Sequence, residues 1–380
     1  MGATRSGFKG RPCCKKQGKR EMIVKGKLMF GLAVIFSITG TGTVAAERVT
    51  VPIETLKPAV HLDKPILKLT GGPLILSDSP ETYEEEGAFY RDQVKGEFRV
   101  FWHHQYGGSG SSHVGVAVTN QSGEAVKLYV KGAGNAVNIY PDVAGEEAMI
   151  SFINSEKQRK YLKTLSPGES CVWDTEVPST YTNSGIAQYQ AYTKAGHQPA
   201  KVTVTTFNYK QNRPVKPEVL PILAGDSHER GTFPHFDRVG TISYPFSLGN
   251  AYISISSSPS GQWNDSLPGE YEEGIDATTG QKVINNGNYG VFYRFRLAMV
   301  NDLRQFRQVT VYDNPAGGFG HFVIKWKNQL LRSGFLSYKD AWLLDRFSVG
   351  SGGRTIKTDL SLPGGAFGPS VLYFTNEPKK

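Results

Sequence analysis

Alternating apolar and polar residues predict β-strands through much of the first half of the chain. Residues 98–104 form one such run, and residues 114–118 alternate valine with small residues, which predicts a strand buried on both faces or nearly so. The segment 120–124, Asn-Gln-Ser-Gly-Glu, predicts a hairpin loop, and residues 127–131 then alternate as a half-exposed returning strand. This order of valine strand, turn and returning strand is typical of immunoglobulin-like sandwiches.

The second half of the chain shows a comparable β pattern. Its clearest strand is predicted at residues 289–300, where Tyr293 and Phe295 face one way and Arg294 faces the other. Apolar residues at helical spacing predict a short surface helix over residues 146–162.

Two further signals concern the second half of the chain. Three prolines within eight residues make the stretch 212–221 the best domain boundary, because proline cannot donate a ladder hydrogen bond. Ser337 and Asp340 resemble a capping box, which predicts a second short helix running through Phe347.

Together these patterns predict a mainly β fold, with two immunoglobulin-like or β-sandwich-type domains after an N-terminal signal peptide and with short inserted helices. The predicted order is a signal peptide (residues 1–46), an extended proline-containing segment (47–76), a first β-sandwich domain (77–211), a linker (212–225) and a second β-sandwich-like domain (226–377). The segment 47–76 is either an extended linker or an edge segment of a sheet.

An uncharged apolar run at residues 28–38 follows two lysines and precedes Val44-Ala45-Ala46. A basic region, an apolar run and small residues at the cleavage site are the parts of a secretory signal peptide, with cleavage expected after Ala46. Met22 could itself begin a compact signal peptide, so the first 21 residues are either a long basic region or a misassigned start.

An uncleaved membrane anchor is the alternative, since residues 28–46 carry no charge over nearly a spanning length. The small and polar residues of the second half of this stretch favour cleavage. In both cases the flanking bases stay in the cytoplasm, so we expect the bulk of the chain to be secreted or held in the cell envelope.

The net charge of the 380-residue chain, +9, belongs to its leader. Residues 1–46 hold nine of the 43 bases and one of the 34 acids, so the remaining chain has 34 bases, 33 acids and a net charge of +1. This argues against a nucleic-acid partner. Cys171 is the only cysteine after the leader, so the exported part cannot form an intrachain disulfide or a cysteine-based zinc site.

Three stretches carry a resemblance: VAVTNQSGEAVKLYVKGAG at residues 116–134, GIDATTGQKVINN at 274–286 and GNYGVFYRFRLAMVN at 287–301. They look like a group of uncharacterised secreted bacterial β-rich proteins, some of which carry a copper amine oxidase N-terminal-like domain. The resemblance implies an exported envelope or extracellular protein. It carries over no catalytic residue, and this chain shows no obvious copy of the extra domain.

Two loops contain residues that could hold a metal ion. His228, His235 and Asp237 combine imidazoles with a carboxylate, which suits Zn²⁺, although the helical spacing of zinc proteases is absent. The acidic loop could hold Ca²⁺ or supply a glycosidase pair, although a solvated loop is the simpler interpretation. Its carboxylates are Asp265, Glu270, Glu272, Glu273 and Asp276.

Other histidines and aromatics are weaker candidates. His103 and His104 are neighbours in a predicted strand and so face opposite ways, which leaves at most one of them to join His113. Trp263 and Tyr271 are candidates for stacking on a sugar, and Trp263 comes first because an exposed loop tryptophan is costly unless it contacts something.

These observations favour an exported, non-enzymatic β protein with a binding or structural role. Its expected partners are a cell-wall glycan or another envelope protein, with a membrane contact only through an uncleaved leader. We expect no cofactor, with Ca²⁺ or Zn²⁺ as the alternatives. The competing hypothesis is a carbohydrate-active or metal-dependent hydrolase that uses the His228/Asp237 loop or the Asp265–Asp276 loop. No Gly-x-Ser-x-Gly elbow and no HExxH motif occurs in the chain.

Overall fold

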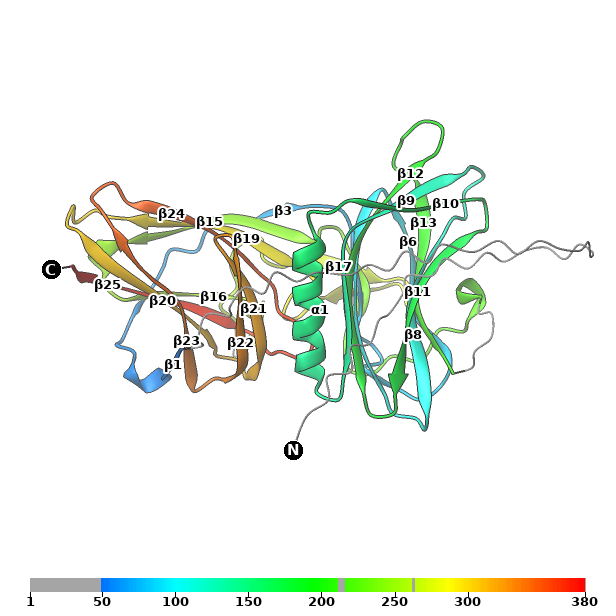
Figure 1. Cartoon of the computed structure of the whole chain (residues 1–380), viewed down its shortest axis with the longest axis horizontal. Helices are drawn as coiled ribbons and strands as arrows, with labels where there is room; N and C mark the ends of the chain where they lie inside the picture. The colour runs from blue at the N-terminus through cyan, green and yellow to red at the C-terminus, as the bar shows by residue number, and fades with distance from the viewer. Residues whose placement is uncertain (1–48, 211–215, 262–263, 380) are drawn as a thin grey trace, which may run out of the picture.

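The computed structural model describes residues 49–210, 216–261 and 264–379, so the predicted signal peptide and Met22 lie outside the described residues. Most of the described chain is β-strand, with one α-helix, α1 (Pro141–Ser155), among these residues. Four sheets pack as two sandwiches, and α1 runs between them (Figure 1). The predicted mainly β fold of sandwich-type domains is therefore confirmed. No helix in these ranges is long and apolar enough to cross a lipid bilayer.

The N-terminal sandwich pairs a nine-stranded sheet with a four-stranded sheet. The larger sheet has the strand order β10 (Lys160–Leu165), β9 (Val126–Asn138), β12 (Thr182–Thr193), β7 (Glu97–Tyr106), β4 (Leu74–Ser77), β14 (Arg230–Phe233), β17 (Glu273–Asp276) and β18 (Gln281–Ile284), and β5 (Thr82–Tyr83) also pairs with β7. The smaller sheet has the order β11 (Ser170–Pro178), β8 (Ser111–Thr119), β13 (Lys201–Tyr209) and β6 (Gly87–Lys95).

The C-terminal sandwich pairs two six-stranded sheets. One has the order β1 (Thr50–Pro52), β23 (Asp340–Val349), β20 (Arg307–Pro315), β25 (Ser370–Pro378), β16 (Ala251–Ile255) and β2 (Val60–His61). The other has the order β22 (Gln329–Ser337), β21 (Phe319–Trp326), β24 (Arg354–Leu360), β19 (Phe292–Val300), β15 (Asp237–Pro245) and β3 (Lys68–Thr70). Short 3-10 helices lie at η1 (Ile53–Thr55), η2 (Pro217–Val219) and η3 (Phe246–Leu248).

Each sandwich has its own apolar core, as the alternating pattern predicts. In the N-terminal core, Trp102 of β7 packs with Val116 of β8 and Leu128 of β9. In the C-terminal core, Tyr293 and Phe295 of β19 are buried, whereas Arg294 lies on the other face of the strand. Period-two alternation therefore identified both the strands and the faces that they bury.

The predicted domain boundaries do not separate the sheets. Of the two interpretations of the segment 47–76, the structure supports the edge segment and not the linker, because β1, β2 and β3 are edge strands of the C-terminal sandwich, while β4 lies inside the nine-stranded sheet. Figure 1 shows β1, in blue, beside the C-terminal strands. In the other direction β14, β17 and β18 come from the predicted second domain, 226–377, yet extend the N-terminal sheet. Backbone hydrogen bonds between distant segments determine which strands share a sheet, and no local sequence pattern indicates those bonds.

Both predicted helices need correction. The helix expected at 146–162 begins at Pro141, whose fixed φ suits the first helical position, and ends at Ser155, because residues 160–165 pair with β9. The helix expected from Ser337 through Phe347 is a hairpin instead. Asp340 accepts hydrogen bonds from the backbone N–H and hydroxyl of Ser337 across the turn between β22 and β23, so the capping-box pattern here stabilises a turn.

A third apolar cluster joins the two sandwiches. Phe101 of β7 and Phe152 of α1 meet Phe236 and Phe292, which precede β15 and begin β19. Helix α1 also packs on β9 and β12 on one side and against β21 on the other. The outward face of the nine-stranded sheet is therefore covered where α1 and the C-terminal sandwich meet it.

Candidate functional site

The predicted histidine loop does not form one site. Its three members have separate ion partners, and only His235 approaches the acidic loop. His228 contacts Glu81 (2.8 Å) and Asp226 (3.2 Å), His235 contacts Glu272 (2.9 Å), and Asp237 contacts Arg99 (2.9 Å) and Arg294 (3.4 Å).

The carboxylates of the predicted acidic loop are likewise held by different partners. Asp265 and Glu273 form ion pairs near the surface, and Arg238 joins His235 at Glu272. The contacts are Asp265 with Lys64 (2.6 Å) and His61 (3.1 Å), Glu272 with Arg238 (3.2 Å), Glu273 with Lys282 (2.9 Å) and Asp276 with Arg230 (3.6 Å).

Glu270 differs from the other four carboxylates because it is buried in the C-terminal sandwich. It accepts hydrogen bonds from the backbone N–H of Ser256 (2.6 Å) and Leu267 (2.7 Å) and from the hydroxyl of Tyr293 (2.8 Å). Burial raises the pKa of Glu270 to about 7 in spite of these donors. Its surroundings make it an anchor of the loop and not a surface group that reaches a substrate.

The described ranges contain no group of three or more histidine, cysteine, aspartate or glutamate residues placed to hold a metal ion. The predicted Zn²⁺ and Ca²⁺ ligands are therefore not brought together within those ranges. Of the two predicted sugar-stacking residues, Trp263 lies outside the described residues. Tyr271 is half-buried, and its hydroxyl donates a hydrogen bond to the carbonyl of Ser257.

The neighbours His103 and His104 face opposite sides of β7, as predicted. His104 lies in the N-terminal core, where its ring is in hydrogen-bond contact with Ser77 (3.0 Å) and stacks on Phe89. His103 faces the junction, and neither ring nitrogen has a hydrogen-bond partner in the described part of the chain. Burial lowers the pKa of His103 to about 4 and that of His104 to about 3, so both are neutral at pH 7.

A surface hollow of about 500 Å³ lies beside Arg91 and Arg230. Both guanidinium groups are already held by backbone carbonyls: Arg91 donates to Pro217 (2.6 Å), and Arg230 donates to Leu223 (2.9 Å). Arg230 also pairs with Asp276. The hollow therefore offers few unused donors to a ligand.

A second cavity, inside the C-terminal sandwich, is about 10 Å³ and so close to the size of one water molecule. Asp313 lines it and accepts a hydrogen bond from the hydroxyl of Ser370 through one carboxylate oxygen. The other oxygen is buried and has no hydrogen-bond partner among the described residues. Burial raises the pKa of Asp313 to about 7.

Replacing Asp313 with asparagine should change how stability depends on pH. Because the folded-state pKa is raised, the stabilisation from protonated Asp313 is fully present below its unfolded pKa, near 4, and is lost as pH rises through about 7. Asparagine cannot ionise, so the Asp313→Asn variant should gain about 2 kcal/mol relative to wild type between pH 5 and pH 8. Urea unfolding gives the free energy of unfolding of both proteins at pH 5 and at pH 8. If the variant differs from wild type by the same amount at both pH values, Asp313 does not ionise in this range.

The surface best suited to a ligand lies on the outward face of β10, β9 and β12, beyond the part that α1 covers. Val126 and Leu128 of β9 point into the core, so Lys127 and Tyr129 point outward. Tyr161 of β10 lies opposite Tyr129, and their ring centroids are 5.6 Å apart. Tyr192 of β12 lies opposite Lys127 and completes the surface.

Arg159, in the connection from α1 to β10, lies over two of these rings. Its guanidinium carbon is 3.9 Å from the ring centre of Tyr129 and 5.9 Å from that of Tyr192. Tyr161 is 52% exposed, and Arg159 is exposed as well. We call the surface formed by Lys127, Tyr129, Arg159, Tyr161 and Tyr192 the tyrosine face.

Hydrogen-bonding groups border the tyrosine face along β7 and β12. The carboxylate of Glu97 accepts hydrogen bonds from Lys131 (3.0 Å), from Gln190 (3.1 Å) and from Gln188. Burial alone would raise the pKa of Glu97, but these donors bring it below its ordinary value. Glu97 is therefore a fixed, ionised acceptor at neutral pH.

Sequence reasoning found only part of this surface. The alternation at residues 127–131 predicts that Lys127 and Tyr129 are half-exposed. The sequence pattern places Tyr161 in a helix and predicts no element for Tyr192. Strand pairing between segments that are about 30 and 60 residues apart brings these rings together. The segment 160–165 is too short for its alternation alone to predict strand β10.

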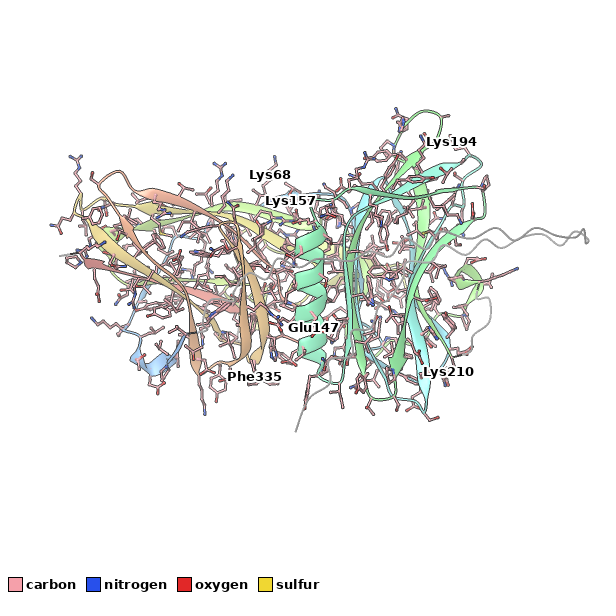
Figure 2. The ribbon with its side chains drawn as sticks, viewed as in Figure 1. Lys68, Glu147, Lys157, Lys194, Lys210 and Phe335 are labelled. Carbon is pink, nitrogen blue, oxygen red and sulfur yellow. The ribbon has the colours of Figure 1, made fainter. Side chains whose placement is uncertain are left out.

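A second exposed aromatic surface lies at the other end of α1. Phe319 has its ring centre 5.9 Å from that of Phe335 and 5.1 Å from that of Phe367, and all three are about half-exposed. Figure 2 shows Phe335 near the same end of α1 as Glu147, whereas Lys157 lies at the end that leads to the tyrosine face. We call these three residues the phenylalanine cluster and use it as a comparison surface in the binding experiments.

The chain matches no protein family model and no curated protein. Among solved structures it is similar to the N-terminal tandem CBM22 domains of a Paenibacillus barcinonensis protein, at 8% identity over 88% of this chain and 92% of that one, with a TM-score of 0.18. It is also similar to the CUB1-EGF-CUB2 domains of human MASP-1/3, at 7% identity over 76% and 99% of the chains, with a TM-score of 0.19. The corresponding rat MASP-1 domains give 8% identity, 77% and 99% coverage and a TM-score of 0.16.

Superpositions at these TM-scores establish no common fold, and no function is transferred from them. None of the three is a copper amine oxidase N-terminal-like domain. The resemblance to secreted bacterial β-rich proteins stays a prediction.

Proposed function

We propose that the protein is an exported, non-enzymatic β protein of the cell envelope or extracellular space that binds a glycan through the tyrosine face. The observation that carries the proposal is the grouping of Tyr129, Tyr161 and Tyr192 on one uncovered sheet surface. A tyrosine ring offers a flat apolar face and a hydroxyl at its tip, which matches the apolar face and polar rim of a sugar ring.

The groups around the three rings support sugar recognition. Binding sites for small ligands combine apolar surface with a few placed polar groups that set orientation. Here the amide of Gln190 and the carboxylate of Glu97 lie beside the rings and are held by hydrogen bonds to each other. They are available to sugar hydroxyls as a fixed donor and acceptor.

The chemistry of the tyrosine face favours binding over catalysis. Glycoside hydrolysis by the usual route requires two carboxyl groups, one of which is a general acid with a raised pKa. Glu97 borders the face, and its pKa is lowered. A carboxylate in that state accepts hydrogen bonds but does not donate a proton to a leaving group.

The export part of the proposal rests on the leader. A basic region, an apolar run and Val44-Ala45-Ala46 make up a secretory signal peptide, and the near-neutral remainder of the chain fits an extracellular protein. The resemblance of residues 274–301 to secreted bacterial β-rich proteins supports the same location.

Replacing Tyr161 with alanine should weaken retention of the mature protein on insoluble cell-wall glycan about tenfold, which corresponds to about 1.4 kcal/mol. The matched control is Phe335→Ala in the phenylalanine cluster, because Phe335 is 51% exposed and Tyr161 52%. Affinity electrophoresis or a pull-down titration measures both variants against wild type. Equal retention of Tyr161→Ala and wild type would contradict the proposed site.

A further inference from the structure

We infer that the glycan bound by the tyrosine face is acidic, a polysaccharide whose sugars carry carboxylate groups. This inference rests on the proposed function and adds the chemical class of the ligand. It depends on the charges around the face.

Bases without carboxylate partners gather at the tyrosine face. Within the described ranges, neither Lys127 nor Arg159 forms an ion pair, and the same holds for Lys157 and Lys194 beside the face. Figure 2 shows Lys157 next to the end of α1 and Lys194 on the loop after β12, along the same edge of the molecule. Glu97 is the carboxylate bordering the face, and Lys131 already neutralises it. Glu156, which directly precedes Lys157 in the sequence, is paired with Arg294, and Glu124 lies in the turn before β9.

This local excess is not a general property of the protein. The chain after the leader has a net charge of only +1, so bases and acids nearly balance. Several bases elsewhere are paired, as in Lys64 with Asp265, Lys282 with Glu273 and Lys327 with Asp345. Mutual repulsion among uncompensated bases costs stability, and a negatively charged ligand would relieve it.

Arg159 is exposed beside the rings, where a carboxylate of a ligand can reach it. Its guanidinium carbon lies 3.9 Å from the ring centre of Tyr129 and 5.9 Å from that of Tyr192, and its N–H groups form a planar fork. A carboxylate can accept two parallel hydrogen bonds from such a fork. The stacked arginine loses little conformational freedom on binding, because the rings already position it.

A glycan fits this surface better than an anionic membrane does. Peripheral membrane binding requires apolar side chains that enter the headgroup region together with the basic charges. The exposed aromatic of the tyrosine face is Tyr161, whose hydroxyl contacts Thr164 (2.8 Å). The phenylalanine cluster, which includes Phe335, lies toward the far end of α1, away from Lys157 (Figure 2).

The test compares polygalacturonate with its fully methyl-esterified form, which keeps the same sugar backbone without the charges. We expect the mature protein to bind polygalacturonate at least tenfold more tightly than the ester at 50 mM salt. That preference should shrink as salt is raised to 500 mM, because screening weakens surface charge pairs.

Three variants identify the group responsible. Arg159→Glu should weaken polygalacturonate binding at least tenfold, and Arg159→Lys should have an intermediate effect because it keeps the charge but loses the planar fork. Lys210→Glu is the matched control, since Figure 2 shows Lys210 in the same sandwich at the opposite edge. Its binding should stay within twofold of wild type. Far-ultraviolet circular dichroism and thermal unfolding check that each variant folds.

The outcomes separate the inference from the proposed function. The protein could bind polygalacturonate and its ester equally tightly, with Tyr161→Ala weakening both. That result would overturn the acidic preference and would still support glycan binding by the tyrosine face. Failure to bind either polymer or cell-wall glycan would overturn the proposed function itself. Equally tight binding to polyglutamate or to phosphatidylserine vesicles would show a general affinity for anions and would also overturn the inference.

Discussion

Replacing Arg99 with methionine should destabilise the protein by about 4 kcal/mol, because it removes one partner of a buried ion pair. Arg99 belongs to β7 of the N-terminal sandwich and is fully buried. Its guanidinium lies 2.9 Å from the carboxylate of Asp237, at the start of β15 in the other sandwich. Its Nη1 donates to the carbonyls of Phe236 (2.7 Å) and Gly290 (2.9 Å), its Nη2 donates to the side-chain oxygen of Gln188 (2.9 Å), and its Nε has no hydrogen-bond partner among the described residues.

The Arg99→Met substitution leaves several polar groups without their donor. Asp237 keeps its contact with Arg294 but loses the nearer ion partner, and two carbonyls at the junction lose theirs. The guanidinium also lies 4.3 Å from the ring centre of Phe236 and 5.0 Å from that of Phe292. Methionine fills part of the volume but replaces none of the hydrogen bonds.

Chemical unfolding monitored by tryptophan fluorescence measures the effect of Arg99→Met. Lys282→Met is the control, since Lys282 is 71% exposed and its surface pair with Glu273 should contribute less than 1 kcal/mol. The double variant Arg99→Met/Asp237→Asn should be less destabilised than the two single variants together, because it removes the unpaired charge. If the destabilisation of the double variant equals the sum of the two single effects, or if Arg99→Met lowers stability only slightly, the ion-pair explanation is wrong.

Replacing Gly134 with alanine should lower stability by about 3 kcal/mol, because α1 packs directly on the backbone of β9 at that position. A Cβ atom added at Gly134 would lie 1.8 Å from the carbonyl oxygen of Ala148 and 2.6 Å from the backbone nitrogen of Phe152. Both are backbone atoms of α1, so no side-chain rotation relieves the overlap. The helix would have to move away from the sheet and from the apolar cluster that joins the sandwiches.

Thermal and chemical unfolding of Gly134→Ala measure this second effect. Gly123→Ala is the matched control, since no atom lies within 4 Å of the added Cβ at that hairpin position. It should unfold within about 0.5 kcal/mol of wild type. Movement of α1 should also displace the connection that carries Arg159, so Gly134→Ala should weaken glycan binding as well. Wild-type stability for Gly134→Ala would mean that helix and sheet are packed less tightly than the structure indicates.

The strands were predictable where one face of a strand is buried. Residues 292–300 alternate because each side chain points to the opposite face from its neighbours, and burial selects apolar residues on one of those faces. Tyr293 lies in the C-terminal core for that reason, whereas both faces of residues 98–104 are buried. This alternation is a local property of the sequence, so it can be recognised without knowing which strands pair.

The helix at 337–347 was predicted wrongly because its signal was ambiguous. A serine followed three residues later by an acid can stabilise the first turn of a helix or a tight turn between strands. Here Trp342 and Leu344, two residues apart, both reach the C-terminal core, which only a strand allows. Burial of that face decided between the two structures.

The described residues of the predicted acidic loop do not gather into one site, for a related reason. Acidic residues that are close in the sequence are separated in the fold, because each binds a base from elsewhere. Asp265 pairs with His61 and Lys64, about 200 residues earlier, and Asp276 pairs with Arg230. A carboxylate cluster in the sequence therefore says little about ligand binding until its counter-ions are known.

By itself, the sequence determined the β class of the fold, the inner faces of many strands and the assignment of the excess positive charge to residues 1–46. These properties follow from local periodicity and composition, which need no partner strand. Only the tertiary structure decided that residues 50–70 complete the C-terminal sandwich, that β14, β17 and β18 extend the N-terminal one, and that three tyrosines and Arg159 share one surface. Strand pairing and ion pairing depend on contacts between distant segments, and the free energy of those contacts is a property of the folded chain as a whole.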